Sequence, residues 1–417
     1  MALDRLERVL AAELETRERE DRLKGKESVM VGVLPAEGAR GPRFLLDGEG
    51  DRPFLRMNSN GYLGLANAPE VVEAEERAAR AYGAGPQAVR FISGTFAPHV
   101  ELETRLADFH VREAAMTYSS AYAAVMGIIP QLIDDRTAVL SDELNHNCII
   151  NATKLREPGF KHVYSHLDMS ALEAGLARSA ETCERAIVIT DGVFSMRGDH
   201  APLDEIVALA RDFDARFAEN VVVIVDDSHG VGALGETGRG VEEVTGARAD
   251  LLIATLGKAL GVNGGYVVGS QTLVDYLRET SPFYIYSNPI TPGEAAAASR
   301  AVEILDSEAG RARIAHMHAM TKRFREGLAR LGHETIPGRH PVVPLMVRSP
   351  ARTRALVAHF RSQGVLATGL HFPVVPEGED EIRFQISSDH TAGDIDEALA
   401  ALASFPASNE DVDRKDG

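Results

Sequence analysis

The chain is poor in cysteine, in long apolar runs and in positive charge, and each shortage excludes a class of protein. Cys148 and Cys183 are the only cysteines among 417 residues, which excludes a disulfide framework and a cysteine-rich zinc site. A single bridge between the two stays open, although a reduced pair is the expectation. No apolar run approaches the ~20 residues that span a bilayer, and the charged N-terminal segment does not resemble a signal peptide. We expect a soluble, cytoplasmic protein without a bound metal.

The charge balance is acidic. Lys and Arg number 44 against 62 Asp and Glu, a formal net charge of −18. Phosphate backbones and anionic membranes are bound by clustered Lys and Arg, so neither nucleic acid nor a membrane is an expected partner. A local basic pocket for a small anionic ligand is compatible with this balance.

Between about residues 54 and 292, short apolar runs alternate with helical patterns. In the stretch 203–217, for example, apolar residues recur at i, i+3 and i+4. Six runs rich in apolar or β-branched residues predict strands: 115–118, 137–140, 186–190, 221–225, 251–255 and 266–269. Continuous apolar strands that alternate with helices predict an α/β fold with a mostly parallel sheet covered on both faces.

The two ends of the chain are predicted to form separate parts. Residues 1–53 form an N-terminal arm that begins with an amphipathic docking helix, and residues 54–292 form a large domain. In residues 293–407 the order of the elements changes. Helices are predicted at 293–305, in the charged run that follows it up to about residue 331, at 352–363 and at 395–405. Strands are predicted at 342–347, 365–371 and 381–387. This order predicts a smaller α+β domain, followed by a frayed tail at 408–417.

One motif points away from this assignment. Gly230-Val231-Gly232-Ala233-Leu234-Gly235 follows a predicted strand and fits the glycine pattern of a dinucleotide-binding turn. In that turn the third glycine opens a helix whose N-terminus holds the pyrophosphate. The continuation Glu236-Thr237-Gly238-Arg239-Gly240 cannot start a stable helix. We therefore expect a loop here and no nicotinamide cofactor.

Two predicted strand ends carry the residues with the most chemistry. Asp226 and His229 follow the run 221–225, and Thr255 and Lys258 follow the run 251–255. Ligands in open α/β sheets bind outside the carboxyl ends of the strands, so these side chains should converge. Taken singly, Asp226 is explained as a cap at the strand end, and Lys258 is explained as a solvated loop lysine. Together they indicate pyridoxal phosphate, which needs a lysine for a Schiff base and a carboxylate that keeps the pyridine nitrogen protonated.

A phosphate cradle is predicted at Ser119-Ser120-Ala121-Tyr122, between a strand and a helical run. Backbone N–H groups of Ala121 and Tyr122 at the start of that helix would face an anion. A plain N-cap by Ser119 or Ser120 is compatible with the same residues.

Motifs spread over residues 3–405 resemble those of the α-oxoamine synthases, pyridoxal-phosphate enzymes of the aspartate aminotransferase-like fold type I. These motifs are Asn60–Leu65, Val89–Thr95, His99–Glu103, Asp142–His146, Thr190–Met196, Asp226–Gly230, Thr255–Gly261, Pro373–Pro376 and Ile382–Phe384. The resemblance implies a mostly parallel central sheet and a smaller α+β C-terminal domain. It also implies a transferase that joins an amino acid to an acyl thioester.

The resemblance further implies roles for single residues around the ring of the cofactor. Lys258 forms the Schiff base and, once freed, removes the Cα proton of the substrate. Asp226 pairs with the pyridine nitrogen, and His229 hydrogen-bonds the phenolate oxygen with the help of Ser195. His146 stacks on the ring, although without the resemblance it would be interpreted as a core histidine.

The phosphate and the substrate have their own implied partners. Thr255 and the backbone at Ala121 and Tyr122 bind the phosphate, joined by two residues of a second subunit, Ser287 and Asn288. The resemblance thus implies a homodimer with a shared active site. The amino-acid carboxylate is held by Arg383 with help from Asn60, since a guanidinium matches a planar carboxylate bidentately. The deprotonated Cα then attacks the thioester and coenzyme A departs.

The motifs leave the individual member open. Residues 88–95 and 369–378 are most similar to glycine C-acetyltransferase, also called 2-amino-3-ketobutyrate CoA ligase, so glycine is the favoured amino acid and an acyl-CoA the donor. The glycine loop 261–265 has instead the length found in 8-amino-7-oxononanoate synthase. Arg197 replaces the usual Asp, and residues 58–61 and 286–289 also depart from common family forms. A decarboxylating member with another amino acid or acyl donor is the alternative, and an aminotransferase or a silent partner subunit is a rival from another class.

Overall fold

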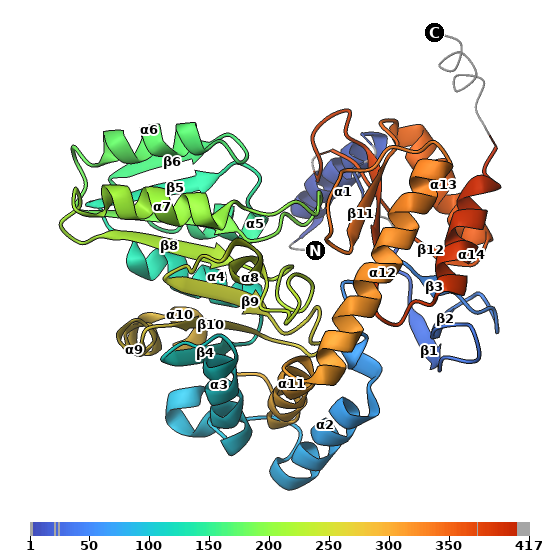
Figure 1. The fold of residues 1–417 in the computed structure, drawn as a ribbon, viewed down its shortest axis with the longest axis horizontal. Coiled ribbons are helices and arrows are strands. Elements are labelled where there is room, and N and C mark those ends of the chain that lie inside the picture. Colours follow the sequence, from blue (N-terminus) through green and yellow to red (C-terminus); the bar gives the residue numbers. More distant parts are fainter. Residues whose placement is uncertain (1–2, 21, 24–25, 373, 407–417) are drawn as a thin grey trace.

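The computed structural model describes residues 3–20, 22–23, 26–372 and 374–406. Its centre is a seven-stranded sheet with the order β4-β10-β9-β8-β7-β5-β6 (Figure 1). The strands are β4 (Ala114–Tyr118), β5 (Thr137–Asp142), β6 (Phe160–Tyr164), β7 (Arg185–Asp191), β8 (Val221–Asp226), β9 (Leu251–Thr255) and β10 (Gly265–Gly269). Strand β10 is antiparallel to both its neighbours, and the other neighbours pair in parallel. The predicted mostly parallel α/β sheet is confirmed.

Helices cover both faces of this sheet because its strands are apolar on both sides. Along β7, Val188 belongs to one buried cluster and Ile189 to another, as the two-residue period of a strand requires. Around the sheet lie α2 (Pro69–Tyr82), α3 (Ala97–Phe109), α4 (Ala121–Ile128), α5 (Asn147–Ala152), α6 (Met169–Ser179), α7 (Leu203–Asp214), α8 (Val241–Thr245), α9 (Gln271–Thr280), α10 (Pro282–Ile285) and α11 (Pro292–Leu305). The shorter turns are η1 (Leu65–Asn67), η2 (Arg90–Gly94) and η3 (Ile129–Leu132).

A second, antiparallel sheet has the order β11-β14-β13 and lies beside the first (Figure 1). It contains β11 (Val342–Met346), β13 (Thr368–Leu370) and β14 (Glu381–Gln385), and packs with α12 (Glu308–Arg330), α13 (Pro350–Ser362) and α14 (Ala392–Ala403). Ile382 and Phe384 of β14 are buried in that packing. Arg383 and Gln385 alternate with them and lie on the opposite face of the sheet.

Two strand predictions differ from the structure. Strand β6 was not expected, because Lys161 and His162 interrupt its apolar pattern and it forms the edge of the sheet. The predicted strand 365–371 is divided into β12 (Val365–Leu366) and β13. Strand β12 pairs in parallel with β3 (Leu55–Arg56), whereas β13 pairs with β14. One run of residues therefore serves two sheets.

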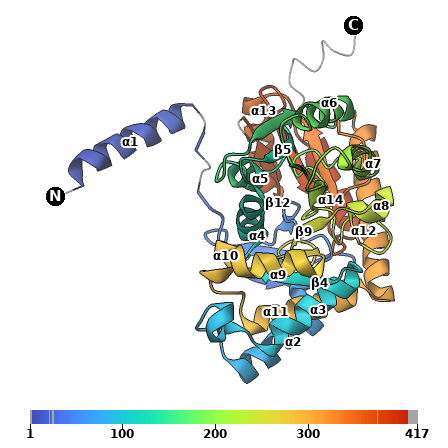
Figure 2. The same cartoon turned by 90° about the vertical axis from the view of Figure 1, so that its left-hand side faces the viewer.

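The N-terminal segment projects away from the rest of the chain. Helix α1 (Asp4–Arg19) has the predicted amphipathic pattern, but none of its residues is buried (Figure 2). It is followed by the hairpin of β1 (Met30–Leu34) and β2 (Arg43–Leu46). The predicted docking helix is thus not buried against the described remainder of its own chain. The predicted tail 408–417 lies outside the described residues.

Both cysteines are free and buried, so the open question of a bridge between Cys148 and Cys183 is resolved in favour of two thiols. Among the described helices, none has the length and apolar character needed to cross a membrane.

Candidate active site

The predicted site residues follow the carboxyl ends of parallel strands. His146 follows β5 and begins α5, Asp226 ends β8, and Lys258 lies in the turn after β9. The N-terminus of α4 follows β4, at the same edge of the sheet. The order of the strands therefore brings together residues that are more than a hundred positions apart in sequence, as expected for an open α/β sheet.

Lys258 lies in a strongly charged setting. Burial lowers the pKa of Lys258, while the carboxylates of Asp226 and Asp191 act in the opposite direction. Asp191 and Asp226 are paired residues at the ends of β7 and β8. Burial and the charge of Asp226 raise the pKa of Asp191 well above its usual range. Within the described part of the chain, the Lys258 amine has no hydrogen bond or ion pair, so it is free to form a covalent bond with a carbonyl ligand.

His146 is held by the residues around it. Its backbone N–H donates to Asp191 Oδ2 at 2.9 Å, and its Nδ1 accepts the backbone N–H of Cys148 at 3.3 Å. The Cys148 thiol lies 2.9 Å from the same Nδ1 and 3.8 Å from Asp226 Oδ2. Burial and the charge of Lys258 lower the pKa of His146, although Asp226 opposes them. The ring is therefore neutral and lies in the same cluster as Lys258 and Asp226.

His229 is buried and fixed from two directions. Its Nδ1 is 2.7 Å from the hydroxyl of Tyr62, and its backbone carbonyl accepts the Nε2–H of His340 at 2.8 Å. Burial, followed by the charge of Lys258, holds the pKa of His229 well below its usual range. A neutral imidazole in this place can donate one hydrogen bond to a ligand without adding a charge.

Arg383 extends from β14 of the smaller sheet toward the loop after β7. Its Nη1 donates to the carbonyl of Ser195 at 2.8 Å. When the Gln385 amide is turned so that both its ends are satisfied, its oxygen accepts from Nε and Nη2 of Arg383 at 2.9 and 2.7 Å. The amides of Gln385 and Asn60 are 3.2 Å apart. The structure thus brings Arg383 and Asn60 together through Gln385, and it places Ser195 beside them.

The predicted phosphate cradle is the N-terminus of α4. Ser120 caps the helix by accepting the N–H of Ala123 at 3.0 Å, which leaves the N–H groups of Ala121 and Tyr122 without a capping partner. Gly265 of β10 packs so closely here that a Cβ would lie 2.2 Å from the Ala121 nitrogen. The plain N-cap is therefore present, and the N–H groups of Ala121 and Tyr122 beside it form no hydrogen bond among the described residues that would exclude an anion.

Thr255 lies at the end of β9, where its hydroxyl donates to the Gly264 carbonyl at 3.2 Å and accepts the N–H of Gly257 at 3.0 Å. Ser287 and Asn288 are different. They lie in the loop after α10, with Asn288 exposed and Tyr286 80% exposed. No hydrogen bond among the described residues joins this pair to the other predicted site residues, so the single chain does not bring them into the cluster.

The glycine-rich segment 230–240 forms a loop, as predicted. It wraps around the buried carboxyl of Asp227, whose Oδ2 accepts the N–H of Val241 at 2.7 Å. A Cβ at Gly230 or Gly240 would lie 2.0 or 1.8 Å from that carboxyl group. Gly230 and Gly240 are therefore explained by close packing around Asp227, and no helix begins at Gly235, since α8 starts only at Val241.

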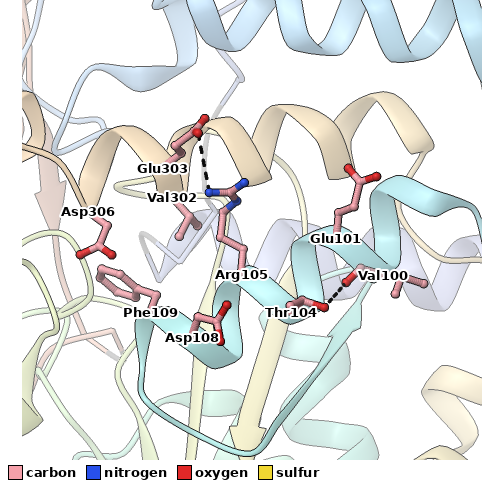
Figure 3. Close-up of a pocket in the computed structure, with 9 residues that line it drawn as sticks. All are labelled: Val100, Glu101, Thr104, Arg105, Asp108, Phe109, Val302, Glu303 and Asp306. Carbon is pink, nitrogen blue, oxygen red and sulfur yellow. Dashed lines mark hydrogen bonds and ion pairs between the residues drawn. The ribbon is translucent and has the colours of Figure 1, made fainter.

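A separate cavity of about 520 Å³ lies between α3 and α11 (Figure 3). None of the predicted site residues lines it. Four of the nine residues that line it are acidic, and Arg105 approaches Glu303 at 3.8 Å across it. Among the described residues, no group of three or more His, Cys, Asp or Glu side chains is arranged to hold a metal ion.

Sequence reasoning did not assign roles to Tyr62, Asp191, Cys148 or Gln385. Tyr62 and Asp191 lie within two of the motifs that carry the family resemblance. Asp191 could have been found, because it ends the strand next to Asp226 in the predicted sheet. The contact of Tyr62 with His229 joins residues 167 positions apart, and only the folded chain reveals it.

Comparisons with known proteins agree with this geometry. The family model for aminotransferases of class I and II matches residues 52–402. The 8-amino-7-oxononanoate synthase of Thermosipho melanesiensis is 38% identical over 91% of this chain and 94% of its own. The mitochondrial 2-amino-3-ketobutyrate coenzyme A ligase of Bos taurus is 38% identical over 95% and 96% of the two chains. The solved serine palmitoyltransferase of Sphingomonas wittichii superposes with a TM-score of 0.85 at 25% identity, over 96% and 97%.

Proposed function

Because the chain belongs to the α-oxoamine synthase family of pyridoxal-phosphate enzymes, we propose that it condenses a small amino acid, with glycine favoured, with an acyl-CoA. Coenzyme A is released, and the product is a 2-amino-3-oxo acid or the α-amino ketone formed from it. The observation that carries this proposal is the free amine of Lys258 among Asp226, His146 and His229 at one edge of the sheet.

The side chains present fit pyridoxal phosphate. When bound, the cofactor supplies a pyridinium ring that accepts the electron pair left on Cα. Lys258 is the residue that would hold it covalently, and Asp226 would keep its ring nitrogen protonated. His229 would donate to the phenolate oxygen, beside Ser195, while His146 would lie against the ring. Its phosphate would meet the N–H groups at the start of α4 and the Thr255 hydroxyl.

Arg383 is proposed to bind the carboxylate of the amino acid. Gln385 occupies its Nε and one Nη2 donor, and Ser195 accepts from Nη1, so the guanidinium plane is fixed before a substrate arrives. A fixed fork loses little side-chain freedom on binding, and it orients the carboxylate. Asn60 contacts Gln385 and would complete this side of the site.

Lys258 is proposed to move the proton of the reaction. Burial lowers the pKa of its amine, which favours the neutral, basic form that would remove the Cα proton. The negative charge that Asp226 and Asp191 share lies nearby, and it would stabilise Lys258 again after the amine has accepted the Cα proton.

The alternative is a reaction closer to that of an 8-amino-7-oxononanoate synthase, in which another amino acid or acyl donor is used and carbon dioxide is lost. Relatives bearing both names are 38% identical to this chain. Arg197, which replaces the usual Asp, favours a specialised member. It pairs with Asp199 at 2.9 Å and with Glu379 at 3.5 Å, beside the strand that carries Arg383. A cytoplasmic location is part of the proposal, since both thiols are free and the cytosol keeps thiols reduced.

The proposed assembly is a homodimer in which the loop with Ser287 and Asn288 completes the phosphate site of the other subunit. Two features support it. That loop is exposed in the single chain, and so is the apolar side of α1, where Leu6, Leu10 and Leu14 are 53%, 48% and 56% exposed. A second copy of the chain would cover both surfaces.

A thiol-release screen tests the reaction. Glycine, alanine and serine are each offered with short and long acyl-CoAs, and product masses show whether carbon dioxide is lost. We expect release with at least one pair and loss of at least about 100-fold in Lys258→Ala. Conversion of a 2-oxo acid without thiol release would identify an aminotransferase instead. Unchanged activity in Lys258→Ala would refute the assignment of the lysine.

A further inference from the structure

The Nδ1 nitrogens of two site histidines, His229 and His146, contact groups to which the proposed function gives no role. The hydroxyl of Tyr62 is 2.7 Å from Nδ1 of His229, and Cys148 presents its backbone N–H and its thiol to Nδ1 of His146. A neutral imidazole carries one proton, on either Nδ1 or Nε2. The partner of Nδ1 therefore decides whether Nε2 can donate a hydrogen bond or only accept one.

The direction of the hydrogen bond between Tyr62 and His229 follows from the amides next to it. With the Gln385 oxygen turned toward Arg383, the amide of Asn60 must present its NH₂ group to Gln385. The same Asn60 amide lies 3.4 Å from the Tyr62 oxygen, so Tyr62 accepts on that side. The single hydroxyl proton of Tyr62 is then available only to His229.

The surroundings keep that proton on the tyrosine. Burial raises the pKa of Tyr62, and among the described residues no carboxylate or other base than His229 forms a hydrogen bond with its oxygen. The ring of His340 meets that of Tyr62 edge-on at a centroid distance of 5.4 Å, while the Nε2–H of His340 holds the backbone of His229. The imidazole of His229 therefore cannot turn to exchange its two nitrogens without losing its hydrogen bond to Tyr62.

We propose that Tyr62 is a positioning residue whose hydroxyl donates to Nδ1 of His229 and so fixes this histidine as the neutral tautomer with its proton on Nε2. Cys148 does the same for His146 through its backbone N–H. The tautomers themselves depend only on these contacts. Their use rests on the proposed function, in which the Nε2–H of His229 donates to the phenolate oxygen of the cofactor.

Nitrogen NMR reads the tautomer directly. In holoprotein labelled with ¹⁵N-histidine, the ring signals of His229 and His146 are assigned by their loss in His229→Asn and His146→Asn. We expect both rings to show a protonated Nε2 and an unprotonated Nδ1 near neutral pH. In Tyr62→Phe, the His229 signals should move toward a mixture of tautomers, and the affinity for pyridoxal phosphate, measured by dialysis, should fall roughly 3- to 10-fold.

A matched control is available in the same fold. Tyr266 and His110 form another buried pair, with Tyr266 Oη 2.9 Å from His110 Nε2. Tyr266→Phe should shift the His110 signals and leave those of His229 unchanged. A proton on Nδ1 of His229 in the wild type would overturn the proposal, and so would unchanged His229 signals in Tyr62→Phe. If Tyr62→Phe does not fold, the wild-type spectrum with and without bound cofactor decides, and a proton on Nε2 of His229 only in the presence of the cofactor would overturn the proposal. If the spectrum is as expected but no acyl-CoA releases thiol, the proposed function fails and the tautomer assignment stands.

Discussion

At the scale of single residues, the site depends on two carboxyl groups that are alike in sequence context but have different tasks. Asp191 and Asp226 end neighbouring strands and face one another as paired residues. Asp191 accepts the backbone N–H of His146, and its pKa is raised by burial and by the charge of Asp226. A second negative charge on the pair is thus disfavoured, and Asp226 is the member proposed to pair with the ring nitrogen of the cofactor.

Asp226→Asn should therefore abolish most of the activity. The amide keeps the shape of the side chain, but it cannot hold the pyridine nitrogen protonated, and we expect kcat to fall at least about 100-fold in the thiol-release assay. Asp191→Asn is the matched control, because its amide oxygen still accepts from His146 and it should lose less than about 10-fold. Equal losses in the two variants would contradict this division of roles.

A second titratable group acts on stability. Although burial alone would lower its pKa, His166 is hydrogen-bonded to Asp142 at 3.1 Å and to Asp199 at 3.3 Å, and its pKa rises to about 9. A folded-state pKa above the unfolded value of about 6.5 stabilises the fold fully below pH 6.5, and that stabilisation is lost as the pH rises toward 9. The wild type should exceed His166→Gln in unfolding free energy by up to about 3 kcal/mol at pH 6. Urea titrations at pH 6 and pH 9.5 measure this, and a gap that does not narrow at the higher pH would disprove it.

The residues predicted from the sequence were those whose position in a strand and chemistry coincide. Asp226, His229 and Lys258 follow apolar runs and carry groups that a surface turn does not require, so their convergence followed from the predicted sheet. Gln385 gave no such signal, because its contact with Arg383 depends on the alternation of one short strand and on the loop opposite it. Its role is a property of packing between distant segments.

At the scale of elements, the close approach of β10 to the start of α4 sets the position of the proposed phosphate site. Gly265→Ala should push the two apart, since the added Cβ would lie 2.2 Å from the Ala121 nitrogen. Overpacking of this kind costs about 1–3 kcal/mol, so affinity for pyridoxal phosphate should fall roughly 5- to 100-fold. Gly269→Ala, at the other end of β10, meets its nearest atom at 3.3 Å and should change the affinity less than about 3-fold. Equilibrium dialysis compares the two variants, and equal affinities would exclude β10 as the support of this site.

The sequence missed strand β6, which is buried on one side only, and it did not separate β12 from β13, which belong to two different sheets. Strand β6 has the burial pattern of an edge strand, with Lys161 and Val163 exposed, so it lacks the continuous apolar run by which the inner strands were recognised. Helix α1 shows the opposite case. Its apolar spacing was clear, but periodicity alone does not reveal which molecule covers the apolar side.

At the scale of the whole molecule, two exposed regions have more apolar character than a monomer needs. Helix α1 projects from the body with its leucines uncovered, and Phe91, Ile92 and Tyr286 are 65%, 65% and 80% exposed. Phe91 and Ile92 lie on η2, whose first residue, Arg90, is held by Glu103 at 2.9 Å. Glu103 also holds Arg278 of α9 at 2.8 Å, and Arg278 donates to Tyr284 of α10. This network of ion pairs and hydrogen bonds therefore links η2 to α10 and to the loop after it, which carries Tyr286. It positions these two exposed segments relative to each other, as an interface requires.

A heterodimer of two inactive variants tests whether that interface shares the active site. Lys258→Ala removes the lysine from one chain, and Asn288→Glu places a carboxylate where the other chain would meet its partner's phosphate. In the mixed dimer, the site with the intact lysine receives an intact loop, so about half of the wild-type activity should return. Co-expression with two affinity tags isolates that dimer, and a dimer of wild type with Lys258→Ala, also about half active, is the reference. A mixed dimer no more active than its parents would mean that the loop with Asn288 does not complete the site of the other subunit.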